Sequence, residues 1–225
     1  MSTTIATVAG YDCTAANIAH LPAGQAAGYV TGSAGVAWTA ADWAAHPGAV
    51  RIDQSPADTV PDYAADVQDV EAGAVTLAEI AARVKVMLAA YQSGVRPGQR
   101  SPAVYASESN ITAVVNALKA GGVASCGLAV ADYSVTQEQA QAAVAESSGP
   151  FPIVWYQHAD AGEYDEGVFS VPWLNAVSVA KPPAPPGQWL DPAAWTWKDA
   201  VLLGTGLDEA LHMFHLSGGQ WVKAQ

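Results

Sequence analysis

Eight short apolar runs recur along the chain up to residue 170, and this repetition limits the fold more than any other feature. The runs cover residues 5–11, 26–31, 49–53, 65–71, 102–106, 127–133, 152–158 and 164–170. Nearly continuous apolar runs of this length are typical of strands buried on both faces, as in parallel sheets. Parallel neighbours need right-handed crossover connections. Eight such strands therefore predict an α/β fold, a (β/α)8 TIM-like barrel.

Helical patterns separate the later runs. Residues 77–93 carry apolar side chains at helical spacing, and Gly94 ends the pattern. Further helices are predicted over residues 110–120 and over residues 137–147, the latter with Thr136 as its N-cap. The gaps between the first strands leave little room, so we expect reduced helices in the first half of the barrel.

The chain is expected to have three parts. A barrel over residues 1–179 is followed by a proline-rich, semi-rigid linker over residues 180–188. Residues 189–225 hold four tryptophans and glycine turns, and form a predicted β-rich extension. Strands are predicted there over residues 195–203, 211–216 and 220–222. The extension is too short to fold alone, so it either packs on the barrel or mediates binding or assembly.

Charge and composition exclude several classes of partner. The chain has 9 Lys and Arg against 21 Asp and Glu, a net charge of −12, which argues against nucleic acid and anionic membrane surfaces. No apolar run is long enough to predict a transmembrane helix, and the N-terminus does not resemble a signal peptide. With 51% hydrophobic residues, the chain can bury a sizeable core.

Cysteine and histidine residues predict neither a metal site nor a cofactor. Cys13 and Cys126 lie far apart in sequence, and we expect two free thiols unless the fold brings them together. The histidines form no ligand set; they are His20, His46, His158, His212 and His215. Nucleotide-binding glycine loops and the GxSxG serine motif are missing from the sequence.

Acidic residues concentrate at the C-terminal ends of the predicted strands, which form the active-site face of such a barrel. At these ends lie Asp12, Asp53, Asp69, Glu71 and Asp132, while Asp160 follows the seventh predicted strand and Asp165 stands at the start of the eighth. Each either lines a carboxylate pocket or caps turn and helix amides. We favour capping for Asp53, Asp132 and Asp160. We favour a functional role for Asp12, Asp69 and Glu71.

The pair Asp69 and Glu71 carries the strongest chemical signal. Two residues apart on a strand, the side chains point to one face, with β-carbons about 6–7 Å apart. Neighbouring carboxylates repel, so that one tends to keep its proton at neutral pH. Such a pair suits acid-catalysed cleavage of a glycosidic bond.

Several motifs in order resemble family-25 glycoside hydrolases, the Chalaropsis-type lysozymes that cleave bacterial peptidoglycan. The motifs are Gly10-Tyr11-Asp12, Asp69-Val70-Glu71, 102–107, 128–133, Trp155-Tyr156-Gln157 and 164–169. The resemblance covers about residues 6–178. It is closer to the uncharacterised glycoside-hydrolase-like domains of actinobacteria and their phages, whose composition is similarly rich in alanine and glycine.

The resemblance implies roles for particular residues. Glu71 would be the general acid, and Asp69 would stabilise charge at the anomeric carbon or act as nucleophile. The acidic floor would be completed by Asp12 and Asp165. The sugar site would be lined by Tyr105, Tyr133, Tyr156 and Gln157. The sequence departs from the family where Cys13 and Thr14 follow Asp12, and where no asparagine follows Asp165.

Two functions follow from these observations. The first is a muramidase-like hydrolase of peptidoglycan or another cell-wall glycan, carried in a phage virion or released from the host cytoplasm. The second is a non-catalytic virion, tail or wall-binding protein built on a degenerate glycosidase barrel. In that case residues 189–225 would hold a second copy of the chain or a virion partner.

Overall fold

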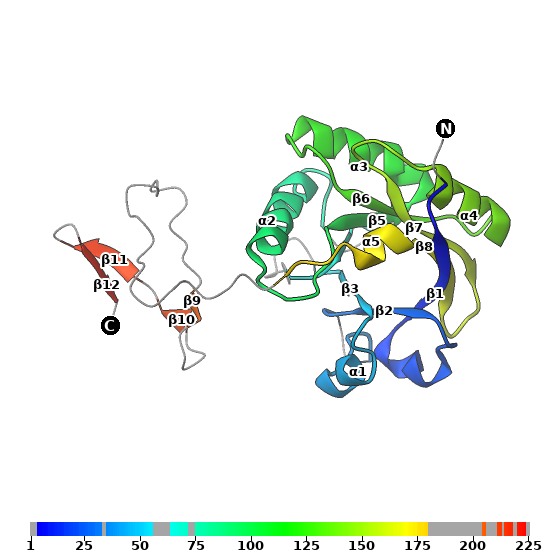
Figure 1. The fold of residues 1–225 in the computed structure, drawn as a ribbon, viewed down its shortest axis with the longest axis horizontal. Helices are drawn as coiled ribbons and strands as arrows, with labels where there is room; N and C mark the ends of the chain where they lie inside the picture. The colour runs from blue at the N-terminus through cyan, green and yellow to red at the C-terminus, as the bar shows by residue number, and fades with distance from the viewer. Residues whose placement is uncertain are drawn as a thin grey trace. The chain divides into compact units, whose positions relative to one another are not determined.

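Eight strands close into a barrel in sequential order in the computed structural model (Figure 1). They are β1 (Thr7–Cys13), β2 (Gln25–Tyr29), β3 (Val50–Asp53), β4 (Val67–Asp69), β5 (Ala103–Ser107), β6 (Gly127–Ala131), β7 (Ile153–Asp160) and β8 (Asp165–Ser170). Each predicted strand is present, with small shifts at its ends. The prediction of a closed α/β barrel is therefore confirmed.

The last strand runs against the others. Strands β1 to β7 pair in parallel, whereas β8 is antiparallel to both β7 and β1. The prediction of eight parallel strands is wrong here, because residues 161–164 are too few for a crossover, which takes about a dozen residues. The reversal brings the start of β8 to the same end of the barrel as the C-terminal ends of the other strands.

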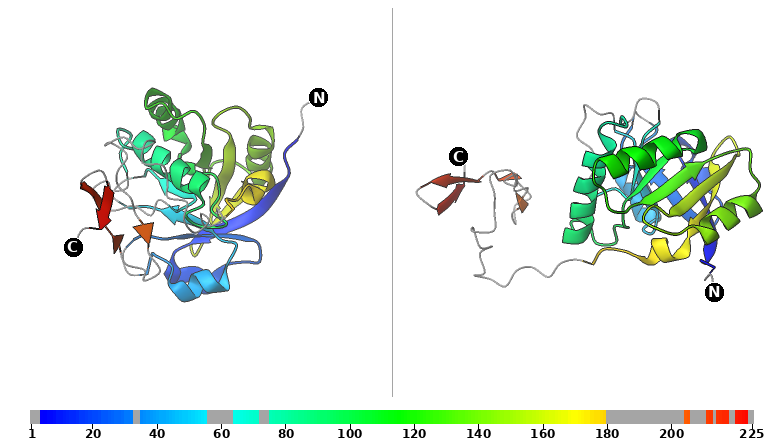
Figure 2. Two further views of the ribbon diagram at one scale, coloured as in Figure 1. Left: turned by 60° about the vertical axis from the view of Figure 1, so that its left-hand side comes forward. Right: turned by 90° about the horizontal axis from the view of Figure 1, so that it is seen from above.

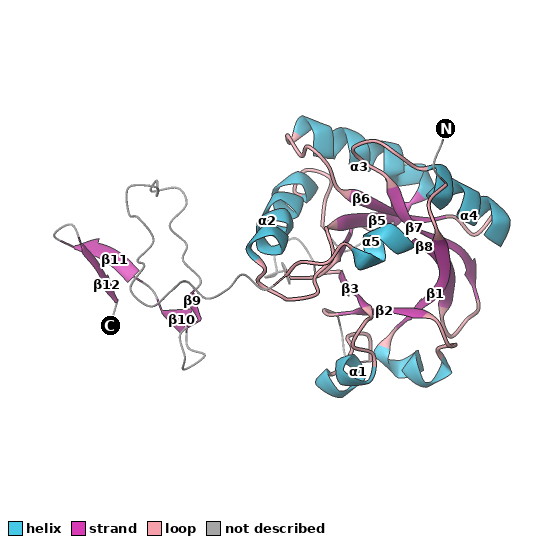
Figure 3. Cartoon of the chain, viewed as in Figure 1, coloured by secondary structure: helices cyan, strands magenta, loops and turns pink. Residues whose placement is uncertain are grey.

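Helices cover mainly the second half of the barrel (Figure 3). They are η1 (Ala15–His20), α1 (Ala40–Ala45), α2 (Ile80–Ser93), α3 (Glu108–Ala120), α4 (Gln137–Glu146) and α5 (Val171–Asn175). Helix α3 packs on β5, β6 and α2, and α4 packs on β7 and β8 (Figure 2). Among the residues that the structure describes, the first three strands are followed by the short η1 and α1 alone, as expected from the short gaps. Gly94 ends α2 with φ 67°, and Thr136 begins α4 in a capping box, both as predicted.

Large rings fill the barrel where β8 meets its neighbours. Trp155 and Phe169 stack with centroids 4.8 Å apart, and both are buried. Gly10 on β1 lies opposite Gly167 on β8. A Cβ on Gly10 would lie 2.3 Å from the ring of Phe169, and one on Gly167 would lie 2.6 Å from Nε1 of Trp155. Glycine at these two positions gives the rings their space.

A buried ionic network holds the entry to β4. Asp66 is fully buried, and its carboxylate contacts Arg96 at 2.5 Å and Arg100 at 3.2 Å. It also accepts the backbone N–H groups of Arg51 at 2.9 Å and Arg100 at 2.6 Å. The network joins β3, β4 and the segment before β5, so Asp66 has a structural role.

The structure describes residues 4–32, 35–55, 64–71 and 75–179 with their side chains, and four short strands beyond them. The chain divides into two units, Met1–Lys181 and Pro182–Gln225. In the second unit, β9 (Gly204–Thr205) pairs with β10 (Leu211–His212), and β11 (Phe214–Ser217) pairs with β12 (Gln220–Lys223), all antiparallel. The strands predicted over 211–216 and 220–222 correspond to β10, β11 and β12. The predicted linker 180–188 and the strand over 195–203 lie outside the described residues.

Cys13 and Cys126 are free, buried thiols, as expected. Among the described residues, no helix is long and apolar enough to cross a membrane.

Candidate active site

Four carboxyl groups gather at one mouth of the barrel. Asp12 lies near the end of β1, Asp69 ends β4, and Glu71 follows in the next bend. Asp165 begins β8 and is paired in register with Asp12, which only an antiparallel β8 allows. Asp12 interacts electrostatically with Asp165 and Asp69, and Asp69 with Glu71, so the four groups form one cluster.

The geometry of Asp69 and Glu71 differs from the prediction. Strand β4 ends at Asp69, so Glu71 does not share a strand face with it. Instead, the carboxylate Oδ1 of Asp69 accepts the backbone N–H of Glu71 at 2.7 Å. This bond shapes the bend and leaves the Glu71 side chain exposed at the mouth, whereas Asp69 is buried below it.

Asp12 is the most deeply buried member of the cluster, with 2% of its surface exposed. Burial raises the pKa of Asp12 to about 8, and the nearby charge of Asp165 adds to the rise. Two hydrogen bonds act in the opposite direction. Gln157 donates to Oδ1 through Nε2, and the Tyr29 hydroxyl donates to Oδ2 at 3.2 Å. At neutral pH, Asp12 therefore holds a proton.

The other three acids also have raised pKa values. Burial raises the pKa of Asp69 to about 7, although the bond from the Glu71 N–H opposes it. Burial is also the cause of the raised pKa of Glu71 and the main cause for Asp165, which accepts a bond from the Tyr133 hydroxyl at 3.2 Å. A cluster that keeps protons near neutral pH beside ionisable neighbours can combine proton donation with stabilisation of positive charge.

The residues expected to bind sugar do not all lie together. Tyr133 is 52% exposed at the mouth beside Asp165. Tyr105 donates its hydroxyl hydrogen to Oε1 of Gln157 at 2.6 Å, and Gln157 is only 1% exposed, below the surface of the site. Tyr156 is the exception, because its ring packs among Leu128, Val144 and other side chains beneath α4. The structure therefore places Tyr156 on the outer face of β7, under α4, since neighbours on a strand face opposite ways and Gln157 faces inward.

Tyr29 belongs to the site although the sequence analysis did not select it. Its hydroxyl group bonds to Asp12, and its pKa is raised, mainly by burial and then by the charges of Asp12 and Asp69. Its position at the end of β2 was the available signal, because that end faces the same mouth.

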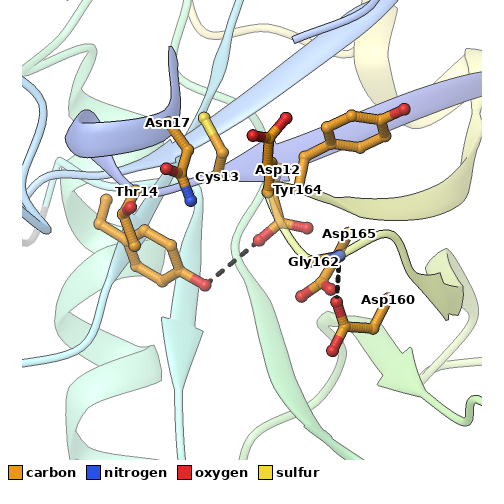
Figure 4. Close-up of a pocket in the computed structure, with 10 residues that line it drawn as sticks. Asp12, Cys13, Thr14, Asn17, Asp160, Gly162, Tyr164 and Asp165 are labelled. Atoms are coloured by element: carbon orange, nitrogen blue, oxygen red, sulfur yellow. Dashed lines mark hydrogen bonds between the residues drawn. The ribbon is translucent and has the colours of Figure 1, made fainter. Parts of the chain in front are cut away.

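A polar pocket of about 240 Å³ opens beside the cluster (Figure 4). It lies between the start of η1 and the β7–β8 turn, and it includes Asp12 and Asp165. The full lining is Asp12, Cys13, Thr14, Asn17, Tyr29, Asp160, Gly162, Glu163, Tyr164 and Asp165. His20 on η1 and Glu163 in the turn form an ion pair at 3.0 Å, which connects the two walls of the pocket.

The remaining strand-end acids cap turns, as we favoured. Asp53 accepts from the backbone N–H and the hydroxyl of Ser55, and Asp132 binds Ser134 in the same way. Asp160 accepts the N–H of Gly162 at 2.6 Å. Within the described ranges, no group of three or more His, Cys, Asp or Glu side chains could hold a metal ion.

Comparisons with protein-family models, with curated proteins and with solved structures gave no match to this chain. The chemistry of the site is therefore the basis for a functional conclusion.

Proposed function

We propose that this chain is a glycoside hydrolase that cleaves the glycan strands of peptidoglycan or a similar cell-wall polymer. The observation that carries the proposal is the cluster of Asp12, Asp69, Glu71 and Asp165, four carboxyl groups with raised pKa values at the mouth of one barrel. Glycosidases use one protonated and one ionised carboxyl group to pass through an oxocarbenium-like transition state. The motif order resembling family-25 lysozymes supports the same reaction class.

Glu71 is the general acid in this proposal. It is the acid whose side chain is exposed at the mouth, so a glycan lying there would meet it directly. Its raised pKa would rise further when the glycan excludes water. Asp69, held by the Glu71 N–H, would stabilise positive charge at the anomeric carbon or act as nucleophile.

Tyr133 and the polar pocket would hold the sugar. An exposed aromatic face beside acids is suited to stacking on a pyranose ring, and Tyr133 is tied to Asp165 by its hydroxyl group. The pocket offers carboxylate, amide and hydroxyl groups for sugar hydroxyls. The class of polymer comes from the family resemblance alone, as does action at the wall of an actinobacterial host.

The test is hydrolysis of purified actinobacterial cell walls at mildly acidic pH. We expect turbidity loss with release of new reducing sugar ends by the wild type. Glu71→Gln should lower the rate about 10²–10⁴-fold, the usual contribution of a general acid. Glu146→Gln, which changes a carboxyl group at the end of α4, should leave the rate unchanged. Lysis without new reducing ends, or lysis by Glu71→Gln at the wild-type rate, contradicts the proposal.

The separate second unit supports an alternative function, a virion, tail or wall-binding protein without catalysis. In this alternative the carboxylate cluster would have no catalytic role. Co-sedimentation with walls in the absence of any new reducing ends is the result expected of it. Binding that is equal for the wild type and Glu71→Gln would strengthen this second candidate.

A further inference from the structure

Gln157 links two tyrosine-bearing strands to the most buried acid of the site. The Tyr105 hydroxyl on β5 donates to Oε1 of Gln157 on β7 at 2.6 Å, and Nε2 of Gln157 donates to Oδ1 of Asp12 on β1. The Tyr29 hydroxyl on β2 bonds to the other oxygen of Asp12, Oδ2, at 3.2 Å. A chain of three hydrogen bonds thus crosses the barrel interior directly below the mouth.

The chain distinguishes the two oxygens of Asp12. Because Tyr105 donates to Oε1 of Gln157, the NH₂ group of the amide faces Asp12. An NH₂ group can only donate, so Oδ1 must accept, and the carbonyl oxygen of a neutral carboxyl group is a better acceptor than its hydroxyl oxygen. A hydroxyl group can donate or accept, so Tyr29 can rotate to accept a hydrogen from Oδ2.

The two ends of the chain also differ in access. Asp12 and Tyr29 line the polar pocket, whereas Gln157 does not and is 1% exposed. Gln157 therefore acts through Asp12, in contrast to the sugar contact that the resemblance implied. Burial raises the pKa of Asp12 to about 8, so the group is neutral, and has a hydrogen to place, in mildly acidic solution.

We propose that Gln157 is a positioning residue that directs the carboxyl hydrogen of Asp12 to Oδ2, the oxygen beside Tyr29 and the pocket. From Oδ2, Asp12 can donate a hydrogen bond to an oxygen of a sugar in the pocket. That last step rests on the proposed glycosidase function, whereas the position of the hydrogen does not depend on it.

The direct test is an atomic-resolution crystal structure of the full chain at mildly acidic pH. A protonated C–O bond is longer than an unprotonated one, so we expect Cγ–Oδ2 of Asp12 to exceed Cγ–Oδ1. Equal bonds, or a longer Cγ–Oδ1, overturn the proposal. This measurement needs no substrate, so it remains decisive if the chain hydrolyses no glycan.

A carbon-13 NMR titration of Asp12 gives a second test with a matched control. Gln157→Met removes the donor, so we expect the pKa of Asp12 to rise above its wild-type value. Gln99→Met removes another fully buried amide, which donates to the Ala65 carbonyl away from the site, and should leave the pKa unchanged. If Gln157→Met does not fold, Gln157→Leu also removes the donor without adding a charge and should raise the pKa of Asp12 in the same way. An unchanged pKa in a folded Gln157 variant overturns the proposal.

Kinetics then separates this proposal from the proposed function. If the wild type cleaves walls, Gln157→Met should lower kcat about 10²-fold with little change in KM, as expected for a misplaced catalytic group. Gln99→Met should keep the wild-type kcat. A wild type that is inactive but shows the longer Cγ–Oδ2 bond contradicts the function and leaves the inference about Gln157 standing.

Discussion

At the scale of single residues, Asp12 is where burial, charge and hydrogen bonding compete most directly. Two donors favour its ionised form, yet burial and the neighbouring acids outweigh them and raise its pKa to about 8. A neutral carboxyl group inside the barrel makes the stability of the fold depend on pH, and this can be measured without a substrate.

We predict that the barrel becomes less stable as pH rises from about 4 to about 8. In the folded state, Asp12 and Asp69 keep their protons to about pH 8 and about pH 7, whereas both release them near 3.8 when unfolded. The folded state therefore binds more protons in this window, and each group lowers the free energy of unfolding by about 1.4 kcal/mol per pH unit. The stabilisation is complete below pH 3.8 and is lost as pH rises through the folded pKa. Urea unfolding at several pH values measures it.

The control for this pH effect is Asp12→Asn, which keeps the shape and cannot titrate. It should flatten the pH dependence of the free energy of unfolding between pH 7 and pH 8. In this range Asp69 has already lost its proton, whereas Asp12 is still losing its own. Acids with lowered pKa values affect stability at and below their unfolded pKa of 3.8 or 4.5, well under the range from pH 7 to pH 8; they are Asp42, Glu79, Asp132 and Glu138. A stability that rises with pH across the window would contradict the assignment of neutral acids.

Asp66 provides a second prediction at this scale. Asp66→Asn leaves two arginines without their buried counter-charge, so we expect a loss of about 3–5 kcal/mol in the free energy of unfolding. Glu163→Gln breaks the half-exposed ion pair with His20 and should cost less than about 1 kcal/mol. Equal effects of the two variants in urea unfolding would show that Asp66 does not hold the entry to β4.

The sequence predicted the acids of the site better than its uncharged residues. Strand-end position sufficed for Asp12 and Asp69, because those ends meet at one mouth. It did not suffice for Asp165, which begins β8 and reaches this mouth only because β8 is antiparallel. It did not suffice for Tyr156, since neighbouring strand residues face opposite ways and the apolar run 152–158 does not show which of them face inward. The partners of Asp12 and Asp66 come from distant strands, and pairwise distance cannot be read from one sequence.

At the scale of elements, apolar patterning located all eight strands but not the direction of β8. A buried strand has the same composition in either direction, so only the short segment 161–164 could have indicated the hairpin. The opposed glycines on β1 and β8 could likewise not be identified as a pair from the sequence. The need for glycine there comes from the rings of Trp155 and Phe169, which an added Cβ would contact.

We predict that Gly10→Ala destabilises the closure of the barrel by about 1–3 kcal/mol, the usual cost of overpacking. Its Cβ would lie 2.3 Å from the Phe169 ring and 2.7 Å from the backbone oxygen of Gln25, which cannot move aside. Gly48→Ala is the matched control, because no atom lies within 4 Å of its added Cβ. Thermal unfolding of both variants measures the difference. Equal melting temperatures would mean that the seam between β1 and β8 tolerates more volume than the structure shows.

At the scale of the whole molecule, the barrel unit holds every side chain of the candidate site. The carboxylate cluster and the pocket lie within Met1–Lys181, and the chain then continues into a second unit with strands of its own. Any hydrolytic activity of the barrel and any assembly through the second unit can therefore be separated by truncation.

We predict that a chain ending at Val179 folds, keeps the melting temperature of the barrel and retains any wall hydrolysis. It preserves Ser178, which bonds to the carbonyl of Arg96 at 2.7 Å and pairs with the backbone of Gln99. A chain ending at Asn175 loses these bonds and should be about 1–3 kcal/mol less stable. Light scattering on the full chain and the Val179 truncation tests the second unit. A full-length oligomer that becomes monomeric on truncation assigns assembly to residues 180–225, whereas an unchanged oligomer places the interface on the barrel.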